Sequence, residues 1–129
     1  MRRFGAAFIL LWVGFTAISA FGNPLQTIAL SAEAAPEADA GATFRSFGSP
    51  SINAHGDVAF HANTLIGPTG SAGVWLGDAS QLNLVVELGD SLPGTIGGAE
   101  VTFISNSFSP LPLNDAGRVL IEAQVRNPQ

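Results

Sequence analysis

Two histidines and an aspartate lie close together in the sequence and are the first candidates for chemistry. Imidazole and carboxylate groups are common metal ligands, so His55, Asp57 and His61 could contribute to a metal site. Such a site needs a further ligand nearby, and a related segment later in the chain has alanine, arginine and glutamate at the corresponding positions. We therefore interpret His55 as a turn residue and His61 as a solvent-facing strand residue, and we predict neither a metal site nor a cofactor.

The aspartates are a second set of candidates. Asp57, Asp78, Asp90 and Asp115 stand at or near glycines that end predicted strands. Turn chemistry accounts for such positions, because a short carboxylate can accept hydrogen bonds from the backbone that follows it. Weak calcium binding at one of these loops is the alternative. No pair of carboxylates has a spacing that indicates a glycosidase.

The remaining candidates give no catalytic set. Residues 67–73 are glycine-rich but lack the lysine followed by serine or threonine that a phosphate-binding loop needs. The chain has no Gly-x-Ser-x-Gly nucleophile motif. Trp75 lies in an apolar motif, which favours a core position over a platform for stacking a sugar ring. We therefore predict that the protein is not an enzyme.

The composition excludes several classes of protein. The 129 residues include no cysteine, so neither a disulfide framework nor a thiolate zinc site can form. The formal net charge is −5 and the pI is about 4.6. Nucleic acids attract basic patches, so this acidic chain is not expected to bind them.

The N-terminus is typical of a secretory signal peptide. Arg2 and Arg3 precede an uncharged, largely apolar run over residues 4–22, which ends in small residues. We place cleavage after Ala20, with Gly22 as the alternative. The run is also close to the ~20 apolar residues that span a membrane, so an uncleaved anchor is a second interpretation. Export of an acidic chain without cysteine favours a bacterial envelope or extracellular location.

Residues 51–62 recur as residues 112–123, which indicates an internal repeat. Asn53 and Gly56 in the first copy correspond to Asn114 and Gly117 in the second. Asparagine can bond the backbone two residues on, and glycine readily adopts the left-handed conformation. We therefore predict that these four residues form two structural turns, each followed by a strand.

Each repeat is predicted to contain four short strands. In the first repeat these strands span residues 49–53, 58–62, 74–76 and 81–88, with a loop over residues 63–73. In the strand at 81–88, the four residues Leu82, Leu84, Val86 and Leu88 are predicted to share one face. In the second copy, Val119, Ile121 and Ala123 are predicted to take the buried face. The predicted repeat core comprises Ile52, Val58, Phe60, Val74, Trp75, Leu76, Leu84, Val86, Leu113, Val119 and Ile121.

The motifs in residues 50–60, 73–78 and 88–94, in this order, carry a family resemblance. Pro-Ser-Ile-Asn-x-x-Gly-x-Val-Ala-Phe, Gly-Val-Trp-Leu-Gly-Asp and Leu-Gly-Asp-Ser-Leu-Pro-Gly resemble bacterial secreted choice-of-anchor proteins with tandem NxxGxxAF repeats. The resemblance implies a long repeat array, a C-terminal surface anchor and no assigned activity. The second copy departs from the motif, with Leu120-Ile121 in place of Ala-Phe, and no anchor is visible before Gln129. The pattern is also similar to a blade of TolB-like propellers.

These observations predict an all-β fold built from four-stranded antiparallel, propeller-blade-like repeats. The predicted organisation is a signal peptide over residues 1–20, an Ala/Glu-rich leader over 21–40, a first repeat over 41–104 and a truncated second repeat over 105–129. A propeller needs about four blades at least. The chain is therefore interpreted as about one and a half repeats of an incomplete array, whose exposed last strand should self-associate or pair with further repeats.

The favoured hypothesis is an exported, non-enzymatic β-repeat protein, with its ligand unknown. A second hypothesis is part of a propeller-type enzyme or a glycan-binding module, with its site on the loops at residues 63–73 and 89–100. A third is an envelope β protein held in the membrane by its N-terminus.

Overall fold

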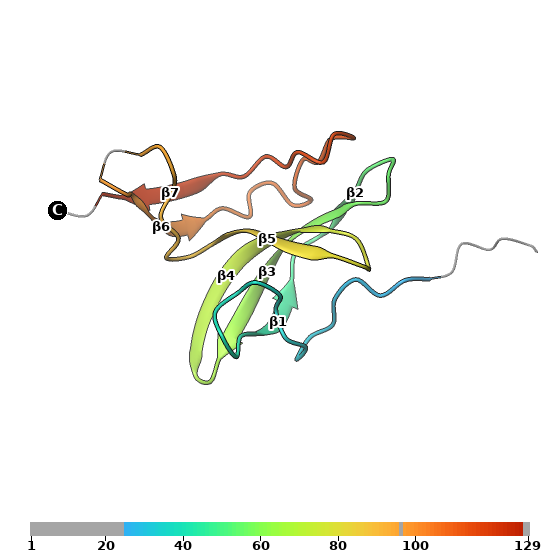
Figure 1. The fold of residues 1–129 in the computed structure, drawn as a ribbon, viewed down its shortest axis with the longest axis horizontal. Helices are drawn as coiled ribbons and strands as arrows, with labels where there is room; N and C mark the ends of the chain where they lie inside the picture. Colours follow the sequence, from blue (N-terminus) through green and yellow to red (C-terminus); the bar gives the residue numbers. More distant parts are fainter. Residues whose placement is uncertain (1–24, 96, 128–129) are drawn as a thin grey trace, which may run out of the picture.

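The computed structural model describes residues 25–95 and 97–127, and β-strands are the only regular structure in this part (Figure 1). The seven strands are β1 (Thr43–Phe47), β2 (Ser51–Ile52), β3 (Val58–Ile66), β4 (Thr69–Gly77), β5 (Leu82–Glu87), β6 (Glu100–Ile104) and β7 (Ala123–Arg126). The predicted signal peptide lies outside the described residues. Within them, no helix has the length and apolar character needed to cross a membrane.

The first sheet is an antiparallel meander. Its strand order is β1-β3-β4-β5, and β2 also pairs with β3. β1 pairs with residues 62–65 of β3 and β2 with residues 58–59, so the two short strands together act as one interrupted edge strand. β6 and β7 form a second, two-stranded antiparallel sheet. The all-β antiparallel prediction is confirmed, although in the described residues the two sheets do not close into a propeller.

The predicted loop over residues 63–73 is wrong. β3 continues to Ile66, β4 begins at Thr69, and only Gly67 and Pro68 connect them. A two-residue hairpin with a positive φ at its first residue is a favoured antiparallel connection, and Gly67 has a φ of 57°. The glycines and alanines of β4 have low intrinsic strand propensity. Pairing with β3 and packing beneath Trp75 override that propensity.

The predicted single buried face of residues 81–88 is also wrong. A bulge in the pairing of β4 with β5 shifts the register between Val74 and Trp75. Leu82 and Leu84 consequently pack with Trp75, whereas Val86 and Leu88 pack with Val74 on the opposite face. One alternating run of residues therefore contributes to two separate cores.

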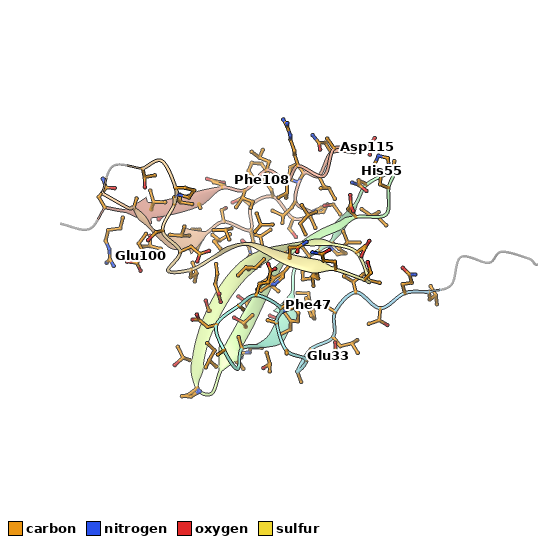
Figure 2. The ribbon with its side chains drawn as sticks, viewed as in Figure 1. Glu33, Phe47, His55, Glu100, Phe108 and Asp115 are labelled. Atoms are coloured by element: carbon orange, nitrogen blue, oxygen red, sulfur yellow. The ribbon has the colours of Figure 1, made fainter. Side chains whose placement is uncertain are left out.

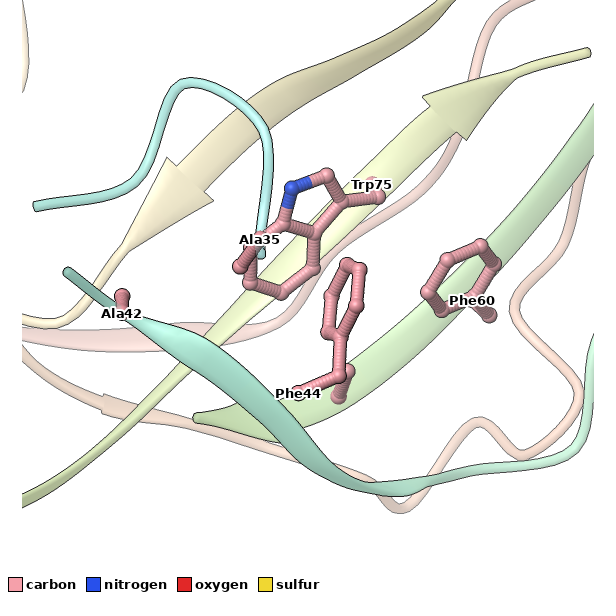
Figure 3. Packing of buried hydrophobic residues seen from close by; sticks show 6 residues of the cluster. Ala35, Ala42, Phe44, Phe60 and Trp75 are labelled. Carbon is pink, nitrogen blue, oxygen red and sulfur yellow. The ribbon is translucent and has the colours of Figure 1, made fainter. Parts of the chain in front are cut away.

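The first core lies on what we call the front face of the first sheet, the face that carries Phe44, Phe60 and Trp75 (Figure 3). The Phe44 ring meets Trp75 edge-on with centroids 5.0 Å apart, a favourable aromatic geometry. Ala35, Ala42 and Ala62 complete this buried cluster. The indole N–H of Trp75 donates to the Pro36 carbonyl over 3.0 Å, so the tryptophan is fully buried with its polar atom satisfied.

The second core lies on the opposite, back face of the first sheet. Val74 and Val86 of that face pack against Val101, Ile104 and Leu111, which belong to the second sheet and its following segment. The second sheet therefore covers the back face of the first, as the two layers in Figure 1 show.

The second sheet copies the start of the first, strand for strand. Phe44 pairs with Thr64 in the first sheet, and Val101 pairs with Val125 in the second. Both strand pairs then shift register across one residue, Arg45 in β1 and Thr102 in β6. Identical pairing that includes the bulge shows that β6 and β7 are the structural counterparts of β1 and the second half of β3.

Two predicted core positions differ from the structure. Ile52 is 71% exposed, because it lies on a two-residue edge strand that no other layer covers. Ala123 was predicted to be buried but is exposed, since β7 pairs with β6 alone in the described residues. The other predicted core residues are buried or half-buried: Val58, Phe60, Val74, Trp75, Leu76, Leu84, Val86, Leu113, Val119 and Ile121.

Candidate functional site

The two asparagine turns have the same internal structure. In the first, the Asn53 side-chain oxygen accepts the backbone N–H of Asp57 over 2.9 Å. In the second, the Asn114 oxygen accepts the N–H of Arg118, also over 2.9 Å. Gly56 and Gly117 have φ values of 90° and 69°, the left-handed conformation that the sequence pattern predicts.

These two turns contact one another through matched positions. The Asn53 side-chain amide donates to the Asn114 carbonyl over 3.2 Å, across 61 residues of chain. The Ala54 N–H donates to the Asp115 carboxylate over 3.0 Å with the same separation, and Figure 2 shows Asp115 beside His55. This contact joins the corresponding ends of the two units.

The contact continues along the edge strand below the turns. The Ser51 hydroxyl donates to the Leu111 carbonyl over 2.6 Å, and the Ser49 N–H donates to the Ser109 hydroxyl over 3.2 Å. We call the four cross-unit hydrogen bonds, from Ser49, Ser51, Asn53 and Ala54, the inter-unit ladder. The ladder connects residues 60 or 61 positions apart throughout, so the two units stack in register.

A further part of the repeat lies in the segment that the sequence predicted as a leader. The Ala32 N–H donates to the Phe44 carbonyl over 2.7 Å, and the Gly89 N–H donates to the Val101 carbonyl over 2.8 Å. Isolated bridges also match, Ala34 with Thr43 and Ser91 with Glu100. Residues 32–44 and 89–101 are therefore equivalent, and we define the first unit as residues 32–88 and the second as residues 89–126.

This equivalence explains two unusual backbone conformations. Ala32 and Glu37 have positive φ values of 68° and 61°, although neither is glycine. Their counterparts are Gly89 and Gly94, with φ values of 95° and 80°. The shared Pro36 and Pro93 were the sequence signal for this element, but an Ala/Glu-rich composition concealed it.

A cleft of about 390 Å³ lies between the two units. Its polar lining side chains are His61, Asn63, Asn106 and Ser109, none of which is acidic or permanently charged. Phe103 adds an aromatic ring that is about half exposed. Burial lowers the pKa of His61 below its ordinary value, which favours the neutral imidazole. The cleft is thus a mixed apolar and neutral polar surface.

The aspartates identified in the sequence accept hydrogen bonds in turns, mostly from backbone N–H groups. One oxygen of Asp78 accepts from the Ser80 hydroxyl and from two backbone N–H groups, and these bonds lower the pKa of its carboxyl, the hydroxyl bond most. Asp90 accepts from the Glu87 N–H, and Asp57 from the Asn53 amide. In the described residues, no group of three or more histidine, aspartate and glutamate side chains could hold a metal ion.

Glu87 is the one acid buried in the described part of the chain. It is 5% exposed, and its Oε1 atom lacks a hydrogen-bond partner there. Burial raises the pKa of this carboxyl, a hydrogen bond from Ser71 opposes the rise, and the nearby charges of Asp39 and Asp90 add to it. Sequence reasoning does not distinguish Glu87, because the alternation of residues 81–88 places it on the exposed side of the predicted strand.

Comparison with known proteins gives one match. The model of a family of unknown function, DUF7453, matches residues 15–129. No curated protein and no solved structure matches the chain.

Proposed function

We propose, for a chain that belongs to the family of unknown function DUF7453, that it is an exported, non-enzymatic β-repeat protein whose units stack as blade-like modules. The observation that carries this proposal is the inter-unit ladder, in which residues 60 or 61 positions apart in the two units bond to each other. Stacking neighbours buries the face that one unit cannot bury alone, as is general for repeat proteins.

The presence of a core on each face of the first sheet supports the blade-like arrangement. The second unit places Val101 against the back face of the first unit, and the counterpart of Val101 is Phe44 on the front face. The units therefore meet front to back, which is a heterologous contact that can continue in one direction. This geometry suits a structural array in the cell envelope or outside the cell.

Export rests on the first 22 residues, with their basic start and apolar run. N-terminal mass spectrometry of the protein recovered from cell fractions tests it. We expect a chain that begins at residue 21 or 23 in the exported fraction. An intact Met1 would favour the alternative, an envelope protein anchored by this segment.

A substrate screen tests the non-enzymatic role. The purified chain should turn over no glycoside, ester, phosphoester or peptide above background. A turnover that disappears in both Asp57→Asn and His61→Gln would overturn the proposal. Asp78→Asn is a matched control, because the Asp78 carboxylate accepts hydrogen bonds only within its own turn, from Ser80 and Gln81.

The inter-unit cleft favours a second candidate function, binding of a neutral ligand such as a glycan. An exposed aromatic ring beside amide and imidazole groups suits an uncharged, hydroxyl-rich ligand. Titration of neutral oligosaccharides should then perturb the NMR signals of Phe103 and His61. Binding that survives Phe103→Ala unchanged would reject the cleft as the site.

A further inference from the structure

We infer that residues 25–30, which we call the capping segment, close the front face of the first unit to a second copy of the chain. The segment covers this face in the way that β5 covers the front face of the second unit. The capping segment and a stacked neighbour would therefore compete for one surface. The inference rests on the front-to-back stacking proposed above, and it concerns the face that stacking within one chain leaves unused.

The backbone identifies the capping segment as the counterpart of β5. The Glu33 N–H donates to the Leu30 carbonyl over 3.3 Å, and the Asp90 N–H donates to the Glu87 carbonyl over 3.2 Å. These matched bonds extend the equivalence of residues 32–44 and 89–101 back to Leu30 and to Glu87, the last residue of β5. Residues 25–30 therefore correspond to residues 82–87 one for one.

The packing of the two segments is equivalent as well. Ala29 stands one residue before Leu30, as Val86 stands one residue before Glu87. Val86 packs in one cluster with Val101 of the second unit. Ala29 packs against the cluster that contains Phe44, the counterpart of Val101. The capping segment and β5 thus cover the same face of two successive units.

The capping segment is held less firmly than β5. β5 belongs to the first sheet through its pairing with β4. Residues 25–30 pair with no strand in the part of the chain that the structure describes. An apolar cavity of about 170 Å³ remains at the contact, and its lining includes Ile28, Ala29, Val58 and Phe60. The segment can therefore leave the front face without breaking a sheet.

Release of the capping segment would uncover an aromatic surface. Phe44, Phe47, Phe60 and Trp75 form a continuous cluster with ring centroids 5.0–6.3 Å apart. Phe47 is already 40% exposed. A contiguous apolar patch of this kind favours association between protein molecules. A heterologous stack would place a second copy on this face.

A charged substitution in the purified chain tests the role of the segment. Ala29→Asp places a carboxylate against the apolar cluster and should release the segment. We expect the fluorescence of a bound apolar dye to rise at least about twofold. The sedimentation coefficient should also rise with protein concentration above that of the parent chain. Thr27→Asp is the matched control, because it adds the same charge at an exposed position of the same segment and should match the parent in both measurements.

Ala29→Val should act in the opposite direction. Valine is the residue type at the counterpart position 86, and it would fill part of the apolar cavity that Ala29 lines. We expect the midpoint of thermal unfolding to rise by about 2–5 °C, with no added association. This variant tests the inference even if Ala29→Asp fails to fold.

Hydrogen exchange at Ala54 separates this inference from the stacking proposal. The Ala54 N–H belongs to the inter-unit ladder, so we expect it to exchange more slowly than in the urea-unfolded chain. Unprotected exchange at Ala54 in the parent chain would reject the stacking and the inference together. With Ala54 protected, three results would reject the inference alone. These are equal behaviour of Ala29→Asp and Thr27→Asp, dye binding without association, and a lowered thermal midpoint for Ala29→Val.

Discussion

Asn53 and Asn114 hold equivalent places in two units, and the side-chain amide of the first donates to the backbone carbonyl of the second over 3.2 Å. Asparagine thus stabilises both the turn within each unit and the contact between the units. Within each unit its oxygen closes a turn, and between units the amide of Asn53 joins the turns. The roles of the two asparagines are therefore unequal although their sequence contexts match.

Substitution of these asparagines should reveal that inequality. Asn53→Ala removes bonds to the His55 and Asp57 backbones and the bond to Asn114, and should lower the free energy of unfolding by about 2–3 kcal/mol. Asn114→Ala removes the bond from the Arg118 N–H and should cost about 1 kcal/mol. Urea unfolding of both variants measures the difference, and equal losses would contradict the second role of Asn53.

Ala32→Gly should stabilise the protein. Ala32 has a φ of 68°, and its structural counterpart is Gly89. Left-handed geometry costs a non-glycine residue roughly 1–2 kcal/mol, against about 0.4–1 kcal/mol for the added freedom of glycine in the unfolded chain. We expect a gain of about 0.5–1 kcal/mol in urea unfolding. Ala40→Gly is the control, since the φ of Ala40 is not positive, and it should give no gain.

Two glycines of β4 should respond oppositely to alanine. Gly73→Ala places a Cβ 2.9 Å from both the Trp75 ring and the Val86 carbonyl, and should destabilise the fold by about 1–3 kcal/mol. At Gly70 the nearest atom lies 3.8 Å from the added Cβ, so Gly70→Ala should be neutral or stabilise by about 0.5 kcal/mol. Thermal unfolding of the pair tests this, and similar midpoints would rule out the close packing of Trp75 on Gly73.

Glu87→Gln should raise stability near neutral pH, because the carboxylate is buried with one oxygen unpartnered. The folded-state pKa of Glu87 lies above its ordinary value, so the folded state binds this proton more tightly than the unfolded state does. The ionised Glu87 carboxylate therefore lowers the free energy of unfolding by its full amount at pH values above the pKa of Glu87 in the folded state. This loss disappears as the pH falls towards the pKa of Glu87 in the unfolded state. The stability gap between Glu87→Gln and the parent chain should close over that interval.

Glu100→Gln is the matched control for this pH dependence. Glu100 is exposed and pairs with Arg126 at 3.6 Å, a surface contact of small energetic effect. Its stability difference from the parent chain should stay within about 0.5 kcal/mol between neutral and mildly acidic pH. A gap for Glu87→Gln that stays constant with pH would show that Glu87 keeps its ordinary titration in the fold.

Local patterns predicted the turns and several strands well. Asn-x-x-Gly requires an acceptor side chain and a left-handed residue, and both appear at Asn53 and Gly56. The alternation that identified β3 placed Phe60 in an apolar core, and the apolar motif around Trp75 placed that residue there too. These features depend on neighbours within a few residues, which the sequence displays directly.

The remaining features depend on distant contacts. The hairpin of β3 and β4 is rich in small residues, and it is stabilised by pairing and by Trp75 packing on Gly73. The bulge that sends Val86 to the back face follows from pairing with β4, which no alternation within β5 can show. The inter-unit cleft and the burial of Glu87 arise only once the second unit packs on the first.

The segment between the first strand and the turn differs in length between the units. Residues 48–50 connect β1 to β2, whereas residues 105–111 connect β6 to the counterpart of β2. The longer connection supplies Ser109 to the ladder and Leu111 to the back-face core. We therefore expect this connection to act as a spacer between the two units. Shortening it to the length of residues 48–50 should change the angle at which two otherwise identical modules are joined.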